Sequence, residues 1–238
     1  MGRIEQARAK RKLIDAHIHL DRFADPVQAL DRLRLVGLRR ALVPGVCEPY
    51  EPPKQLEGVE FGYGQHPLFD PEPDWFARLG QAIDQDRPDA LGELGLDRNA
   101  GPDQLEVLSQ QLLLARARSL PMIIHLVGDG GPLLAAVRGH SSSVMLHRCS
   151  GRPTRFESWW KAGCYISVGP RVGNDLRLLK AVPDHLLLLE SDAEHEDDAP
   201  WETLPALYNA AARAKNCSSD SIKSLVFANY IRFLKGKR

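Results

Sequence analysis

The sequence predicts an α/β fold and, within that class, a closed (β/α)8 TIM barrel. Short apolar segments alternate with amphipathic segments roughly eight times along the chain, which is typical of parallel β-α units. The 238 residues are enough for one barrel domain. No glycine-rich phosphate-binding sequence follows the first strand, which disfavours an open dinucleotide-binding sheet.

The alternation predicts the order and approximate bounds of the elements. Strands are predicted at 13–16, 40–46, 59–64, 90–97, 121–124, 143–146, 165–168 and 185–189. Helices are predicted at 26–37, 73–86, 103–119, 132–137, 154–162, 174–181, 200–215 and 218–234. In the helix at 103–119, Leu105, Leu108, Leu112 and Ala115 are expected to form the apolar face. Prolines at 49, 52 and 53 disfavour a helix between strands two and three, so a shortened, irregular crossover is expected there.

Composition limits the classes of protein that the chain can belong to. Residues 1–12 are predicted to be an exposed basic lead-in, and residues 13–238 a single domain. Lys plus Arg and Asp plus Glu both number 31, so no overall attraction to nucleic acid or to an anionic membrane is expected. The 4 cysteines are scattered without a CxxC pair, and no secretory signal or membrane-length apolar run is present. A soluble, cytoplasmic protein is therefore expected.

His17 and His19 follow the first predicted strand in a His-x-His pattern. Side chains at i and i+2 of a strand point the same way, so the two imidazoles could supply half of a metal site. An isolated pair of this kind is more often a hydrogen-bonded core histidine with a surface neighbour. The rest of the chain decides between these interpretations.

Further ligand-type side chains stand at the ends of other predicted strands: His66, Glu93, His125, His147 and Asp192. The carboxyl ends of all strands open on the same face of a barrel, where active sites are built. Gathering this many imidazoles and carboxylates in one place is costly without a counter-ion, and divalent metal would balance them. His140, His185 and His195 lack this context and are left as ordinary structural residues. Asp192 itself lies in an acidic run, 190–198, of a kind that is usually a solvated loop.

Six segments support a resemblance to a known family. They read DAHIHLD (15–21), GQHP (64–67), GELGLD (92–97), PMIIH (121–125), HRCSG (147–151) and LESD (189–192), and NYIRF (229–233) closes the chain. In this order they resemble the motifs of the TatD-type metal-dependent hydrolases, deoxyribonucleases with an amidohydrolase-like TIM barrel.

The resemblance implies a binuclear metal site and a reaction. His17, His19 and Asp192 would hold one divalent ion, His125 and His147 a second, and Glu93 would bridge the two. The ions would be Zn, Mn, Mg or Fe. His66 would lie near the substrate phosphate. The implied activity is hydrolysis of phosphodiester bonds in DNA or RNA, with a 3′-to-5′ exonuclease as the typical form. A metal-activated water would attack, and Asp192 would be the general base.

Departures from the family pattern concern the substrate rather than the ligands. Val127 stands where the family has an arginine, and Cys149 replaces an aromatic residue. Residues 194–198 are acidic where the family is basic. Arg98 and Arg148 are the expected substrate-binding cations, since phosphate backbones are bound through Lys and Arg. Two alternatives remain open: hydrolysis of a small ester, lactone or amide, including an aminoacyl-tRNA ester, and a non-catalytic barrel subunit.

Overall fold

Eight parallel strands form the centre of the structure and neighbour one another in chain order. The structure is a computed structural model that describes residues 13–51 and 56–236, so the predicted lead-in at 1–12 lies outside the described residues. The strands are β1 (Leu13–Asp15), β2 (Leu38–Pro44), β3 (Val59–Tyr63), β4 (Ala90–Asp97), β5 (Met122–Val127), β6 (Val144–Cys149), β7 (Tyr165–Val168) and β8 (Leu187–Leu189).

The ends of β1 and β8 bring the two edges of the sheet together. The backbone N–H of Ala16 donates to the carbonyl of Leu189 at 3.0 Å. The N–H of Asp192 donates to the carbonyl of His17 at 2.9 Å. These bonds draw the first and last strands together at their carboxyl ends, so the predicted TIM barrel is confirmed.

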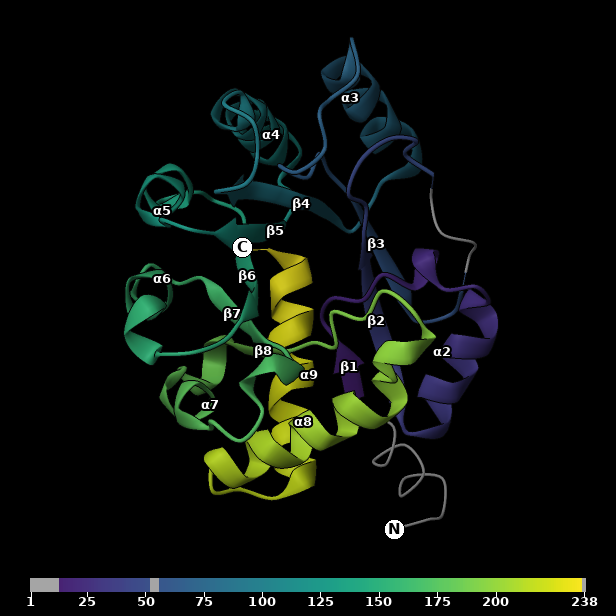
Figure 1. Cartoon of the computed structure of the whole chain (residues 1–238), viewed down its shortest axis with the longest axis vertical. Coiled ribbons are helices and arrows are strands. Elements are labelled where there is room, and N and C mark those ends of the chain that lie inside the picture. Colours follow the sequence, from purple (N-terminus) through teal and green to yellow (C-terminus); the bar gives the residue numbers. More distant parts are fainter. Residues whose placement is uncertain (1–12, 52–55, 237–238) are drawn as a thin grey trace.

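Helices surround the strands, as Figure 1 shows. They are α2 (Pro26–Leu35), α3 (Trp75–Asp86), α4 (Gln104–Arg118), α5 (Gly131–Val137), α6 (Glu157–Lys161), α7 (Arg177–Ala181), α8 (Pro200–Ala214) and α9 (Ser219–Lys235). Within the described residues, none of them is long and apolar enough to cross a membrane.

The predicted elements differ from the observed ones where proline changes the local geometry. The helix expected at 154–162 is divided into a 3-10 turn that begins at Pro153 and the shorter α6. The strand expected at 185–189 begins with a 3-10 turn, Asp184–Leu186, capped by Pro183, so β8 has only 3 residues. Proline fixes φ near −65° and cannot donate a backbone hydrogen bond, which favours such turns. The described parts of the β2–β3 connection, 45–51 and 56–58, contain no helix, as predicted.

The apolar face of α4 is the predicted one only in part: Leu108 and Ala115 are buried and Leu112 packs against the core, but Leu105 does not. Leu105 is 57% exposed. The buried side consists of Val107, Leu108, Gln111, Leu114 and Ala115. Because α4 has apolar residues on more than one side, their spacing did not define which face meets the barrel, and a glutamine takes a central buried position.

Helices α8 and α9 pack against the strands at the amino end of the barrel. The hydroxyl of Tyr208 in α8 donates to the carbonyl of Ile14 in β1 at 3.0 Å. From α9, the Tyr230 hydroxyl donates to Oε2 of Glu60 in β3 at 2.8 Å. The Asn229 side chain donates to the carbonyl of Leu187 in β8 at 2.7 Å. Helices α8 and α9 therefore close the amino end of the barrel, and the loops at the carboxyl end are available to form a site.

Candidate metal centre

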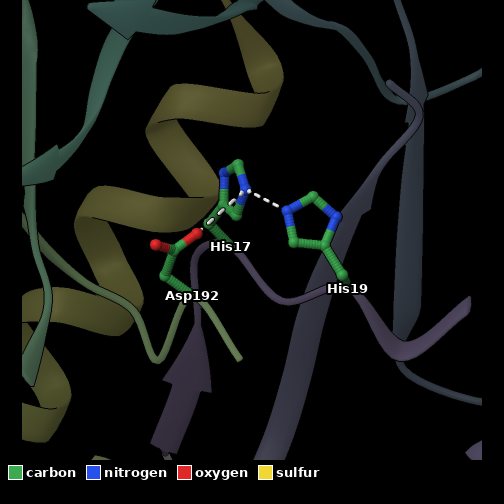
Figure 2. Close-up of side chains that lie close together, drawn as sticks. All are labelled: His17, His19 and Asp192. Atoms are coloured by element: carbon green, nitrogen blue, oxygen red, sulfur yellow. Dashed lines mark hydrogen bonds and ion pairs between the residues drawn. The ribbon is translucent and has the colours of Figure 1, made fainter. Parts of the chain in front are cut away.

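His17 and His19 lie just beyond β1 and converge with Asp192, which follows β8 (Figure 2). The Nε2 atoms of the two rings are 3.2 Å apart. Nε2 of His17 is also 3.7 Å from Oδ1 of Asp192. The structure therefore brings together the three residues that the resemblance assigns to one ion, and their ligand atoms all lie within 4.8 Å of one another.

The carboxylate of Glu93, on β4, lies at the middle of the site. Its Oε1 is 3.2 Å from Nε2 of His17 and 2.8 Å from Nε2 of His147. Its Oε2 is 3.7 Å from Nε2 of His66. The rings of His17 and His147 are stacked with centroids 4.1 Å apart. One carboxylate thus contacts imidazoles from three parts of the barrel: the ends of β1 and β3, and strand β6.

His125, on β5, completes the group. Its Nδ1 is 3.3 Å from Nε2 of His147, and its Nε2 is 2.9 Å from Oδ2 of Asp97. His66, Glu93 and His125 form a second cluster whose ligand atoms could hold an ion, and His17, His147 and Glu190 form a third. The clusters share or adjoin the same residues, so the structure groups His66 and His147 differently from the pairing that the resemblance implies.

The residues of the site have too few N–H groups to hydrogen-bond all the ring nitrogens and carboxylate oxygens that lie together there. A ring nitrogen close to another nitrogen or to a carboxylate oxygen forms a hydrogen bond only if one atom of the pair carries a proton. A neutral imidazole has a single N–H to donate. The Nδ1 atoms of His17, His19 and His147 are buried without a hydrogen-bond partner among the described residues. Unpaired buried polar groups are destabilising, and a shared cation would satisfy several of them at once. The donor set therefore fits a divalent metal.

Burial and mutual charge shift the pKa values of the site in opposite directions. Burial disfavours the charged form of His17, but the Glu93 carboxylate outweighs it and raises the pKa of His17 to about 9. Burial also opposes ionisation of Glu93, yet His147 and His17 hold its pKa well below the usual range. Burial lowers the pKa of His66 to about 4, and it also lowers the pKa values of His19 and His125. Three imidazoles of the site are thus neutral, the form in which histidine binds metal.

Two carboxylates of the site were not singled out as ligands or supports by the sequence. Asp97 bonds the far nitrogen of His125, an arrangement that orients metal-binding imidazoles. Asp97 is four residues after Glu93 on the same strand, so both side chains are on one face. This spacing could have indicated from the sequence that Asp97 belongs to the site. Glu190, in the acidic run that contains Asp192, is fully buried. Its Oε1 lies 3.8 Å from Nδ1 of His147.

The two arginines predicted to bind substrate lie in different surroundings. The Nε atom of Arg148 is 2.7 Å from Oδ2 of Asp192. Arg98 follows β4 on the exposed surface. No ion pair of its side chain is found within 13–51 and 56–236. Only Arg148 is therefore in contact with the cluster.

The acidic loop after β8 is organised by its own carboxylates. Glu194 pairs with Arg22 at 2.6 Å, and Glu196 accepts from the N–H of Ala24 at 3.1 Å. Asp198 accepts from the N–H of Glu194 at 2.8 Å. The loop is thus folded against the segment after β1, and its partly exposed carboxylates form an acidic side of the site's rim.

Comparisons with known proteins agree with this geometry. Residues 14–235 match the family described as "TatD related DNase". Human deoxyribonuclease TATDN3 is 29% identical over 167 residues, covering 62% of this chain and 60% of that protein, and the match to mouse TATDN3 covers 41% of its length. The chain therefore spans less than two thirds of the TATDN3 relatives.

Two bacterial proteins extend the comparison. YjjV of Escherichia coli, described as an uncharacterized metal-dependent hydrolase, is 28% identical over 212 residues, which cover 76% of this chain and 79% of YjjV. Its crystal structure superposes with a TM-score of 0.79 over 92% of this chain and 96% of that chain. The 3′-5′ ssDNA/RNA exonuclease TatD of Dickeya dadantii is 29% identical over 119 residues, covering 44% of this chain and 45% of that protein. Because the family match spans nearly all of the barrel and includes every strand end of the site, this chain belongs to the TatD related DNase family.

Proposed function

We propose that this chain is a divalent-metal-dependent hydrolase that cleaves phosphodiester bonds in single-stranded DNA or RNA from the 3′ end. The observation that supports this most directly is the contact of Glu93 with both His17 and His147 beside Asp192. It gives one buried carboxylate access to two metal positions. The described activity of the TatD relative, an exonuclease on single strands, guides the choice of substrate.

In this proposal His17, His19 and Asp192 would hold one ion. His125 and His147, whose Nδ1 and Nε2 atoms are 3.3 Å apart, would hold the second, and Glu93 would contribute its carboxylate to both sites. Bound there, divalent ions would neutralise phosphoryl oxygens and lower the pKa of an attacking water. Mixed imidazole and carboxylate ligands suit Zn²⁺, Mn²⁺ or Fe²⁺ better than Mg²⁺.

The side chains of the chain itself then have distinct tasks. Asp192 takes the proton of the attacking water as a general base while the water oxygen forms its bond to phosphorus. The bond from phosphorus to the leaving sugar oxygen breaks, and that oxygen takes a proton from solvent, to which Asp192 in turn returns the proton it accepted. His66, neutral because burial lowers its pKa to about 4, has its Nε2 3.7 Å from Oε2 of Glu93 and would donate a hydrogen bond to a phosphoryl oxygen bound there. Asp97 holds the ring of His125 in place.

Metal removal and substrate choice test the proposal together. Protein stripped with a chelator should lose hydrolysis of bis-p-nitrophenyl phosphate and of a 3′-labelled single-stranded oligonucleotide, and Mn²⁺ or Zn²⁺ should restore both. Turnover of carboxylic esters or lactones alone, with no phosphodiester cleaved, would instead support a small-ester hydrolase. A metal-loaded protein that cleaves none of these would leave a non-catalytic barrel.

A further inference from the structure

Arg148 follows His147 at the end of β6, and its side chain reaches Asp192 beyond β8. These strands are separated by β7 in the sheet, so the contact spans part of the barrel mouth. Both residues have positive φ, 55° at Arg148 and 53° at Asp192. Residues other than glycine adopt this conformation uncommonly, and such cases cluster at functional sites.

The backbone of Arg148 is held by a hydrogen bond to a buried side chain. Its N–H donates to Oε1 of Glu190, whose side chain is fully buried. Gly169, at the end of β7, lies against Glu190, and a Cβ there would approach Cγ of Glu190 at 3.7 Å. The main chain at 148 is thus held by a buried carboxylate, while the side chain is 34% exposed at the rim.

The guanidinium has N–H donors that no group of the described chain uses. It carries five N–H donors in a planar fork, and its contact with Asp192 is an ion pair at Nε, 2.7 Å from Oδ2, without hydrogen-bond geometry. No other ion pair of Arg148 is present in the part of the chain that the structure describes. The terminal nitrogens are therefore available to an incoming group, and a guanidinium fork matches two oxygens of a phosphate better than an ammonium does.

We propose that Arg148 is both a substrate-binding and a positioning residue: Nε orients the Asp192 carboxylate, and the terminal nitrogens bind non-bridging oxygens of the scissile phosphodiester. This inference rests on the proposed phosphodiesterase activity. It assigns recognition of the phosphate to an arginine on β6, next to the proposed metal ligand His147. A single guanidinium would then contact both the general base Asp192 and the phosphate.

A purely structural role makes a different prediction. If Arg148 only fixed the loop after β6, its replacement would lower thermal stability without a selective effect on phosphate binding. A role in binding and positioning raises KM and lowers kcat in the folded protein. It also weakens binding of a product that presents the same phosphate oxygens.

Three variants separate these roles: Arg148→Gln, Arg148→Lys and the control Arg152→Gln. Arg152 is exposed four residues further along the chain, without an ion pair among the described residues. Metal-loaded proteins would be compared for kcat and KM on bis-p-nitrophenyl phosphate. Binding of thymidine 5′-monophosphate would be measured by calorimetry, a readout that does not need turnover, and metal content and melting temperature would be recorded for each.

Arg148→Gln should raise KM and the Kd of the nucleotide about tenfold and lower kcat by a similar factor. Arg148→Lys should recover part of the binding because it keeps the charge but not the fork, and Arg152→Gln should stay within about twofold of wild type. An active wild type whose Arg148→Gln and Arg148→Lys variants keep kcat, KM and nucleotide affinity within twofold would overturn the inference alone. An inactive wild type on every phosphodiester would overturn the proposed function instead.

Discussion

The Glu93 carboxylate and the His17 imidazole form a charged pair, and His17 must lose its proton before it can bind metal. The two are 3.2 Å apart and buried. In the metal-free protein Glu93 raises the pKa of His17 to about 9 against the opposing effect of burial, so the ring carries a proton at neutral pH. Metal binds the neutral ring, so His17 has to lose this proton first.

Metal binding at pH 7 should therefore release about one proton from His17. Apparent affinity should rise about tenfold per pH unit up to the pKa of His17 and level off above it. His19, His66 and His125 contribute no protons because burial lowers their pKa values. Calorimetric titration of Mn²⁺ in two buffers of different ionisation enthalpy measures the number directly. Glu93→Gln should abolish the release, and a wild type that releases no proton would contradict the assignment of charge to His17.

Asp192→Asn tests the general base. Asparagine keeps the size and one oxygen of the side chain but cannot accept the proton of the attacking water. We expect kcat to fall by roughly 10² to 10⁴. Metal content has to be measured on the same samples, since Asp192 is also a proposed ligand. Normal metal content together with an undiminished rate would show that another group is the base.

At the level of secondary structure, Gln111 links helix α4 to the site. Its side chain is fully buried. Its Oε1 accepts from the N–H of Gln65 at 2.8 Å, and its Nε2 donates to the carbonyl of Gln65 at 2.9 Å. Gln65 directly precedes His66, so a helix on the outside of the barrel holds the end of β3 from which His66 enters the site.

Gln111→Leu should destabilise the protein and loosen His66. It leaves a buried N–H and a buried carbonyl unpaired, which costs about 2–4 kcal/mol in free energy of unfolding if each contributes about 1–2 kcal/mol. KM for a phosphodiester should rise several-fold while metal content stays normal. Gln110→Leu, one position along the same helix and partly exposed, is the matched control and should change unfolding by under about 0.5 kcal/mol. Equal urea midpoints for the two variants would argue against the link.

The elements show how far the sequence defines this fold. The strand ends of the site were predictable, because parallel strands place every residue that follows them on one face of the barrel. The exposure of Leu105 was not predictable, because α4 has apolar side chains on several faces and the choice among them depends on what the barrel presents. The burial of Glu190 was not predictable either, since a carboxylate in an acidic run gives no sign of the partners that bury it.

On the scale of the whole molecule, the barrel separates stability from chemistry at its two ends. At the amino end, Glu60 is buried and accepts from the Tyr230 hydroxyl of α9, while Arg40 pairs with its other oxygen. The candidate metal centre lies at the carboxyl end, on the other side of the barrel core. The two groups share no residue, so their contributions to stability should be nearly additive.

Tyr230→Phe and metal loading should therefore shift the melting temperature independently. The variant removes a hydrogen bond to a buried carboxylate, which is worth about 1.5–3 kcal/mol. At 2–4 °C per kcal/mol for a chain of this size, the melting temperature should fall by roughly 3–12 °C. Metal at one hundred times its Kd adds about 2.7 kcal/mol and should raise the melting temperature by roughly 5–11 °C in wild type and variant alike. Scanning calorimetry of both proteins, with and without Mn²⁺, gives the four temperatures. If metal no longer raised the melting temperature of the variant, the amino end of the barrel would be coupled to the metal centre rather than independent of it.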